Sequence, residues 1–158
     1  MKKIGLFLLV AIMILLYGCP YSSEVPIDEP SVKYDQNIIG KWAKPSNEND
    51  YYLIKSFDDY RFIITSFEKN SDGGYDSKDS YCYFSKIKDV LFLNMKEADK
   101  NEYTFYKVVF DGNSNIKLYP VTEYITEKFT KSSDLKKFFS KNLKLSFFYE
   151  TPDEYEKM

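Results

Sequence analysis

Few side chains in this sequence are suited to covalent or acid–base chemistry. The 158 residues include 24 Asp and Glu, two cysteines and no histidine. A chain without imidazole has no histidine general base, no Ser-His-Asp triad and no histidine-ligated zinc. It also lacks a Gly-x-Ser-x-Gly nucleophile elbow, and no spacing marks two carboxylates as a glycosidase pair. We therefore expect no catalytic residue and no enzymatic activity.

Cys82 and the acidic segment 68–79 are two further candidates for chemistry. Cys82 lies between tyrosines in an apolar run, which favours a buried, inert thiol, because a nucleophile needs a nearby cation to lower its pKa. Segment 68–79 has oxygen-bearing side chains at positions 1, 3, 5, 9 and 12 and glycine at position 6, as in an EF-hand loop. However, it starts with Glu, ends with Asp and is flanked by predicted strands. We expect a solvated hairpin tip, with no metal and no cofactor.

Cys19 ends a segment with the features of an export signal. Lys2 and Lys3 precede the almost wholly apolar run 4–16. As a helix this run rises roughly 20 Å, which is short of the roughly 30 Å hydrocarbon core of a bilayer. A basic start followed by an apolar run of this length is typical of a secretory signal.

Leu16-Tyr17-Gly18-Cys19 resembles the lipobox of bacterial lipoproteins, with a bulkier residue than usual at Tyr17. The resemblance implies a signal peptide at residues 1–18, a diacylglyceryl group on the Cys19 thiol and cleavage just before Cys19. Pro20 stands where an Asp usually signals retention in the inner membrane, so the resemblance implies the outer membrane. Two or three acyl chains would anchor the chain permanently, at roughly 0.8 kcal/mol per buried CH2.

The mature chain is predicted to carry one domain behind a tether. Without residues 1–18 it has 20 basic and 24 acidic side chains, a net charge of −4 that argues against nucleic-acid binding. Segment 19–35 contains three prolines and many polar residues, which is typical of a flexible tether carrying the lipidated cysteine. One domain is expected over 36–149.

From Gln36 onward, short runs rich in Tyr, Phe, Val, Ile and Thr alternate with turn residues, which predicts an all-β, mainly antiparallel meander. The expected strands lie near 38–42, 51–57, 60–67, 80–87, 90–96, 103–111 and 115–120. Several of these runs are apolar on both faces, so they need a covering layer outside as well as a core inside.

One short C-terminal helix, at about 133–142, is predicted to supply that cover. Ser132-Ser133-Asp134 is suited to capping its N-terminus, and the helix presents an apolar stripe of Leu135, Phe138 and Phe139. Alternation over 143–147 predicts a last strand, and the acid-rich segment 150–158 is expected to be a frayed tail.

Gly40-Lys41-Trp42 resembles the Gly-x-Trp signature at the first strand of lipocalins. The resemblance implies a lipocalin-like eight-stranded barrel with Trp42 as a structural plug, although a β-sandwich stays open as an alternative. Lipocalins usually pack a late-chain arginine on this tryptophan. The single arginine here, Arg61, lies in an early strand, so that partner is absent.

Together these features predict a lipid-anchored, monomeric binding or accessory module of the cell envelope, without catalytic activity. Its partners would be the membrane, through Cys19, and either a small hydrophobic ligand or an envelope protein or glycan. An anchored inhibitor of a toxin or lytic enzyme is one alternative, and a carboxylate-dependent enzyme acting on envelope glycans is another. Tyrosine-rich strands that include Tyr52 and Tyr106 offer rings that are both apolar and able to hydrogen-bond.

Overall fold

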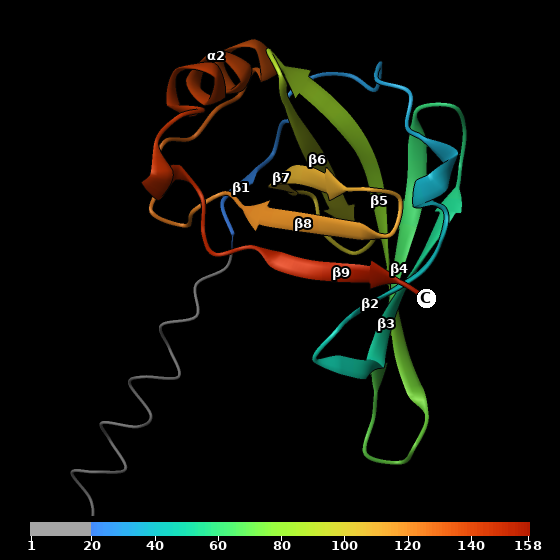
Figure 1. Ribbon diagram of the computed structural model, residues 1–158. Helices are drawn as coiled ribbons and strands as arrows, with labels where there is room; N and C mark the ends of the chain where they lie inside the picture. Colours follow the sequence, from blue (N-terminus) through green and yellow to red (C-terminus); the bar gives the residue numbers. More distant parts are fainter. Residues whose placement is uncertain (1–19) are drawn as a thin grey trace, which may run out of the picture.

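A computed structural model describes residues 20–158, and the strands in this part of the chain close into a barrel (Figure 1). The predicted export signal and Cys19 lie outside the described residues. The barrel strands are β2 (Gly40–Lys44), β3 (Asn47–Ser56), β4 (Arg61–Lys69), β5 (Tyr75–Ile87), β6 (Val90–Glu97), β7 (Tyr103–Asp111), β8 (Asn115–Pro120) and β9 (Asp153–Lys157). Neighbouring strands pair antiparallel, and β9 joins β8 to β2. The predicted eight-stranded antiparallel barrel is confirmed, and the sandwich alternative is excluded.

The closing strand is not the one that the sequence predicted. Residues 143–147 form a turn leading into the short 3-10 helix η2 (Ser146–Phe148), and segment 150–158, expected to be a frayed tail, contains β9. Tyr155 points into the barrel, while Glu154 and Glu156 lie on the opposite face of the strand. The acids that suggested a solvated tail are therefore the outward half of a strand with period-2 alternation.

The expected flexible tether is also wrong for the described residues 20–35, which we call the N-terminal strap. Ser22–Ser23 form β1, which pairs with β7, and Tyr21 and Ile27 are buried against the outside of the barrel. The apolar residues of the strap are too few and too irregularly spaced to produce a strand or helix pattern. Tyr21 and Ile27 are nevertheless buried, because they pack against apolar side chains on the outer face of the barrel.

Buried hydrogen bonds fasten the strap to the barrel. The Ile27 backbone N–H donates to Asn94 Oδ1 at 3.0 Å, and Asn94 Nδ2 donates to Ser85 Oγ at 2.8 Å. Ser85 Oγ donates to Asp28, and Lys136 Nζ donates to the other carboxylate oxygen of Asp28 at 2.6 Å. Asn94 and Ser85 are fully buried, so each needs the partner that the strap supplies.

Helix α2 (Ser132–Asn142) covers the outside of the barrel, as the predicted helix at about 133–142 should. Its N-cap is Lys131, which makes no side-chain cap bond, so the Ser-Ser-Asp cluster lies within the first turn instead of capping it. Leu135 and Phe139 are fully buried. With the strap and η2 the helix covers a set of buried side chains that we call the outer core: Tyr21, Ile27, Ile87, Phe92, Phe105, Val121, Leu135, Phe139 and Phe148.

Candidate functional site

The interior of the barrel contains a cavity of about 270 Å³. Its wall is formed by inward-facing side chains from all eight barrel strands, and most of these are apolar. The lining residues are Ile38, Trp42, Lys44, Tyr52, Ile54, Phe62, Ile64, Phe84, Leu93, Met95, Tyr106, Val108, Phe110, Ile116, Leu118, Asp153 and Tyr155. Such a cavity can take a small molecule whose surface is largely apolar.

Trp42 lines one end of this cavity, and its burial agrees with the prediction of a core tryptophan. It is buried, and its indole Nε1–H donates to the Ile38 carbonyl at 2.8 Å, at the end of the 3-10 helix η1 (Gln36–Ile38). The Lys157 Nζ lies 5.8 Å from the centre of the indole ring and donates to the Asn37 carbonyl at 2.6 Å.

Lys157 is therefore a late-chain cation near Trp42, where the lipocalin resemblance leads us to expect an arginine. The sequence analysis missed this residue because it considered only arginine as the partner of the tryptophan. Arg61, the arginine noted in the sequence, instead bonds Asp58 at 2.6 Å in the β3–β4 turn. Gly40 makes room for Lys157: its φ is +131°, and a Cβ there would lie 3.2 Å from the Lys157 Cε. Both its conformation and this close approach favour glycine.

The opposite end of the cavity is polar. Lys44 Nζ and Asp153 Oδ1 form an ion pair at 2.6 Å, and the Tyr52 and Tyr155 rings meet edge to face with centroids 5.2 Å apart. Burial raises the pKa of Tyr106 to about 12, and burial together with neighbouring Tyr52 and Asp153 raises the pKa of Tyr155 further. Both tyrosines therefore keep neutral hydroxyls at physiological pH, and these can donate to or accept from a ligand.

Sequence reasoning did not single out Lys44, Asp153 or Tyr155 as site residues, although it had included Tyr52 and Tyr106 among the tyrosines of interest. The signal that could have identified them is the alternation of Asp153, Tyr155 and Lys157 along one face of the last strand. The sequence contains this alternation, but only the pairing of β9 with β2 shows that this face lines a cavity.

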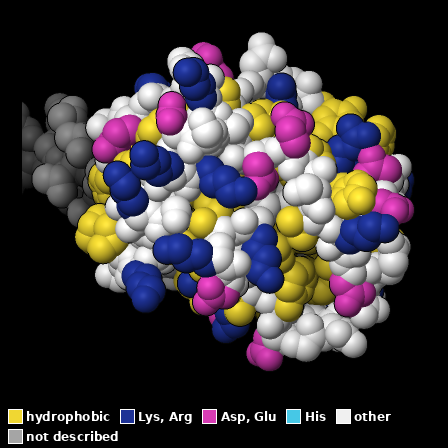
Figure 2. Space-filling view, turned by 90° about the horizontal axis from the view of Figure 1, so that it is seen from above, with side chains coloured by type: hydrophobic (Ala, Val, Ile, Leu, Met, Phe, Trp, Pro, Cys, Tyr) yellow, Lys and Arg dark blue, Asp and Glu magenta, His cyan; other side chains and the backbone are white. Residues whose placement is uncertain are grey.

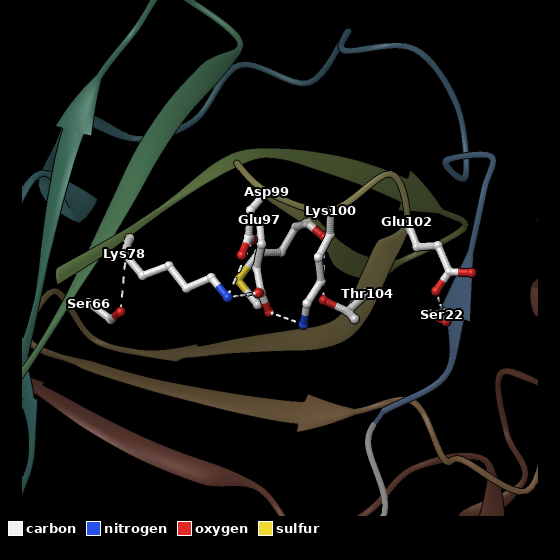
Figure 3. Close-up of polar contacts among 9 residues, drawn as sticks. Ser22, Ser66, Lys78, Glu97, Asp99, Lys100, Glu102 and Thr104 are labelled. Atoms are coloured by element: carbon white, nitrogen blue, oxygen red, sulfur yellow. Dashed lines mark hydrogen bonds and ion pairs between the residues drawn. The ribbon is translucent and has the colours of Figure 1, made fainter. Parts of the chain in front are cut away.

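Glu97 follows Met95 by two residues on β6 and belongs to a cluster of charged side chains (Figure 3). Lys78 extends toward Glu97 and Asp99, forming an ion pair with Glu97 and lying 3.4 Å from Asp99. Lys100 Nζ lies 2.9 Å from the other oxygen of Glu97. Partial burial alone would raise the pKa of Glu97, but the bonds from the two lysines outweigh it and hold this pKa below its usual value.

The other two candidates for chemistry have structural roles. Cys82 is buried inside the barrel, which confirms the predicted burial of its thiol, and this burial raises the thiol pKa and so opposes formation of the thiolate. Segment 68–79 contains the tip of the β4–β5 hairpin and the adjoining ends of both strands, and at the tip Asn70 Oδ1 accepts from the Gly74 backbone N–H at 2.8 Å. Asp79 lies several residues down the ladder, opposite Thr65 and bonded to it at 2.7 Å. Within residues 20–158, no group of three or more Asp, Glu or Cys side chains is placed to hold a metal ion.

A second hollow, of about 480 Å³, lies between the strap and the barrel. Acids of the strap, Glu24 and Glu29, line it together with Arg61 and Lys96 of the barrel. Because both signs of charge and several aromatic rings share its wall, it has no apolar interior comparable with that of the barrel cavity. We interpret this hollow as part of the contact between the strap and the barrel and not as a ligand site.

In residues 20–158 no helix has the length and apolar character needed to cross a membrane. A scan against protein-family models and searches of curated proteins and of solved structures find no match for this chain. The candidate site therefore has to be interpreted from its own geometry.

Proposed function

We propose that the mature chain is a lipid-anchored protein of the bacterial cell envelope that binds a small, largely apolar ligand inside its barrel. The cavity of about 270 Å³ is the observation that carries this proposal. Its volume lies just below the roughly 300–1,000 Å³ of small-molecule sites. This favours a compact ligand, such as a ring system or a short acyl group, over a long lipid chain.

The polar end of the cavity indicates what else the ligand carries. The Lys44–Asp153 ion pair and the hydroxyls of Tyr52, Tyr106 and Tyr155 gather there, whereas the end near Trp42 is apolar. A ligand with one polar group at the end of an apolar body would bury the body and leave that group at the ion pair. A few well-placed polar groups in an otherwise apolar pocket typically set the orientation of a ligand.

The same geometry makes the two alternative functions less favourable. An inhibitor of a toxin or lytic enzyme acts through its outer surface and has no need of an internal cavity. A carboxylate-dependent glycosidase needs two acids across its site, whereas Asp153 is the one carboxylate among the described residues that line the cavity, and Lys44 neutralises it.

Native mass spectrometry of the mature protein produced in a bacterial host tests ligand binding. We expect an excess mass that is lost on denaturation. The variant Leu118→Trp places an indole in the cavity and should abolish this excess mass. The variant Val109→Trp, which adds the same ring to an exposed position on the adjacent strand β7, should keep it. If both variants retain the same bound mass, the ligand is not in the barrel and the proposal fails.

The anchor has its own test. Cys19→Ala should block lipidation and cleavage, so that the precursor accumulates with its signal peptide still attached. A chain that is still cleaved and still fractionates with membranes after this substitution would show that the lipoprotein assignment is wrong.

A further inference from the structure

Tyr124 and Phe147 are the most exposed large apolar side chains in the described part of the molecule, at 83% and 72% of their full accessibility. The backbone next to each of them is hydrogen-bonded. The Thr122 N–H donates to the Phe148 carbonyl at 3.0 Å, and Val121 forms a β-bridge with Tyr149. These two exposed aromatic rings therefore lie on adjacent segments, and together we call them an apolar projection.

This projection lies beside the point where the described chain begins. The Tyr21 backbone N–H donates to the Val121 carbonyl at 3.0 Å, and the Tyr21 hydroxyl donates to the Glu127 carbonyl at 2.9 Å. Figure 1 shows β1 next to the orange and red segments on either side of α2. Three residues after Cys19 the chain is already paired in the sheet at Ser22, and three residues span at most about 10 Å. An acyl anchor on Cys19 would therefore bring this side of the molecule down onto the bilayer.

The charge of this region also differs from that of the rest of the molecule. Segment 121–149 carries six lysines and three acids, a net charge of +3, whereas the rest of the described chain has 14 basic and 21 acidic side chains, a net charge of −7. Lys128 and Lys144, which flank Tyr124 and Phe147 in sequence, are exposed. In Figure 2, dark-blue lysines and yellow hydrophobic side chains lie together on the left of the molecule. Lysines beside aromatic rings are the composition found at anionic lipid surfaces.

We propose that Tyr124, Phe147, Lys128 and Lys144 form a membrane-contact face that rests on an anionic bilayer and fixes the orientation of the anchored barrel. The inference depends on the anchor at Cys19 proposed above. The rings enter the boundary between headgroups and acyl chains, where apolar faces sit roughly 5–10 Å deep, and the lysines meet lipid phosphates. In this orientation the acidic remainder of the molecule is held away from the bilayer.

The test places tryptophan reporters in the full-length, processed protein embedded in phosphatidylethanolamine–phosphatidylglycerol vesicles that contain lipids brominated on the acyl chains. Phe147→Trp is compared with Phe57→Trp, a similarly exposed ring in the β3–β4 turn (55% accessible), with wild-type emission from Trp42 subtracted. We expect strong quenching at position 147 and little at position 57. Equal quenching at the two positions would overturn the proposal.

Charge is tested on the same reporter. Lys128→Glu combined with Lys144→Glu should reduce quenching of the Phe147→Trp reporter on anionic vesicles, whereas Lys55→Glu, an exposed change on β3, should not. Unchanged quenching in the double variant would remove the electrostatic part of the proposal. The mass of the purified chain reports independently whether Cys19 is lipidated. If it is not, vesicles added to the unanchored protein still show whether position 147 meets lipid, so failure of the anchor and failure of this face are distinguished.

Discussion

The two faces of the barrel sheet are lined by similar apolar side chains, but the inner face borders a cavity, whereas the outer face is covered by the helix, the strap and η2. Phe92, Phe105 and Phe139 of the outer core are fully buried, and their ring centroids lie 5.3–5.4 Å apart where they meet. On the inner face Tyr52, Ile64 and Leu118 border the cavity.

The difference follows from what bounds each face. The helix, the strap and η2 are separate segments that can settle onto the outer face until its gaps are filled. The inner face is bounded by the barrel itself, whose radius is set by the number and tilt of its strands and cannot shrink around the side chains. Stability can thus come from the outer core while the interior stays open for a ligand.

Removing β9 should have the largest effect on this arrangement. Truncation after Thr151 takes away the strand that joins β8 to β2 and also removes Tyr155 from the interior. We expect a loss greater than the roughly 3–5 kcal/mol of a large core truncation. In urea denaturation followed by circular dichroism, the cooperative transition should disappear. Deletion of Met158 alone, which leaves β9 intact, is the control, and a truncated protein with normal cooperativity would show that closure is dispensable.

Matched leucine truncations measure the contrast between the two faces. Leu135→Ala opens a hole in the tightly packed outer core and should cost roughly 4 kcal/mol, toward the upper part of the usual range. Leu93→Ala, at a residue equally buried but lining the cavity, should cost roughly 1 kcal/mol less, because its neighbours already lack some contacts. Equal losses in chemical denaturation would indicate that the two faces are packed alike.

Asn94→Ala tests how firmly the strap is fastened. It leaves the buried Ile27 N–H without its acceptor and Ser85 without one of its partners, so we expect a loss of about 2–3 kcal/mol. Hydrogen exchange should show faster exchange at Ile27 in the variant. Asn101→Ala, in the exposed β6–β7 connection, serves as the control. Unchanged protection at Ile27 would mean that the strap is held by its apolar contacts alone.

Adding volume should have opposite consequences on the two faces. Val121→Phe overfills the outer core and should cost roughly 2 kcal/mol, whereas Ile64→Phe grows into the cavity and should change stability by less than about 1 kcal/mol. Thermal denaturation of the two variants without ligand makes the comparison. A large loss for Ile64→Phe would mean that the cavity cannot accept a ring.

The smallest expected effect is at Glu97. Because the folded protein holds the pKa of Glu97 below its ordinary value of 4.5, the ionised side chain contributes stability that is present above pH 4.5 and is lost as pH falls through the lowered pKa. Glu97→Gln should therefore cost less than about 1 kcal/mol at pH 7, since its lysine partners are partly exposed, and nothing at low pH. A stability difference that persisted at low pH would contradict this account.

The sequence predicted several elements correctly because local patterns specify them. Strands with β-branched and aromatic residues, glycine-containing turns and the apolar stripe of α2 depend on neighbours within a few positions. Helix 133–142 and the burial of Trp42 and Cys82 follow from such patterns and are confirmed. The prediction that a further layer covers the outside of the barrel is also confirmed, because strands that are apolar on both faces cannot leave one face in water.

The strap and the closing strand were missed for the opposite reason. Ile27 follows Val25 and Pro26 in a short stretch without strand or helix periodicity, and Tyr155 stands between acidic residues. Their burial depends on sites that include Asn94 and Trp42, which lie 67 and 113 positions away in the sequence. Likewise, the role of Lys157 beside Trp42 depends on the register in which β9 pairs with β2. Composition alone cannot indicate such pairings, and prolines and acids made both segments resemble solvated chain.

By itself, then, the sequence determined the all-β class, the covering helix, the buried tryptophan and the buried thiol, because each depends on short-range periodicity and hydrophobicity. Only the tertiary structure decided that the barrel closes through its last strand, that it contains a cavity lined by Lys44 and Asp153, and that the strap packs against it. The physical reason is that closure, register and the space left inside a barrel depend on all strands at once, and no local segment encodes them.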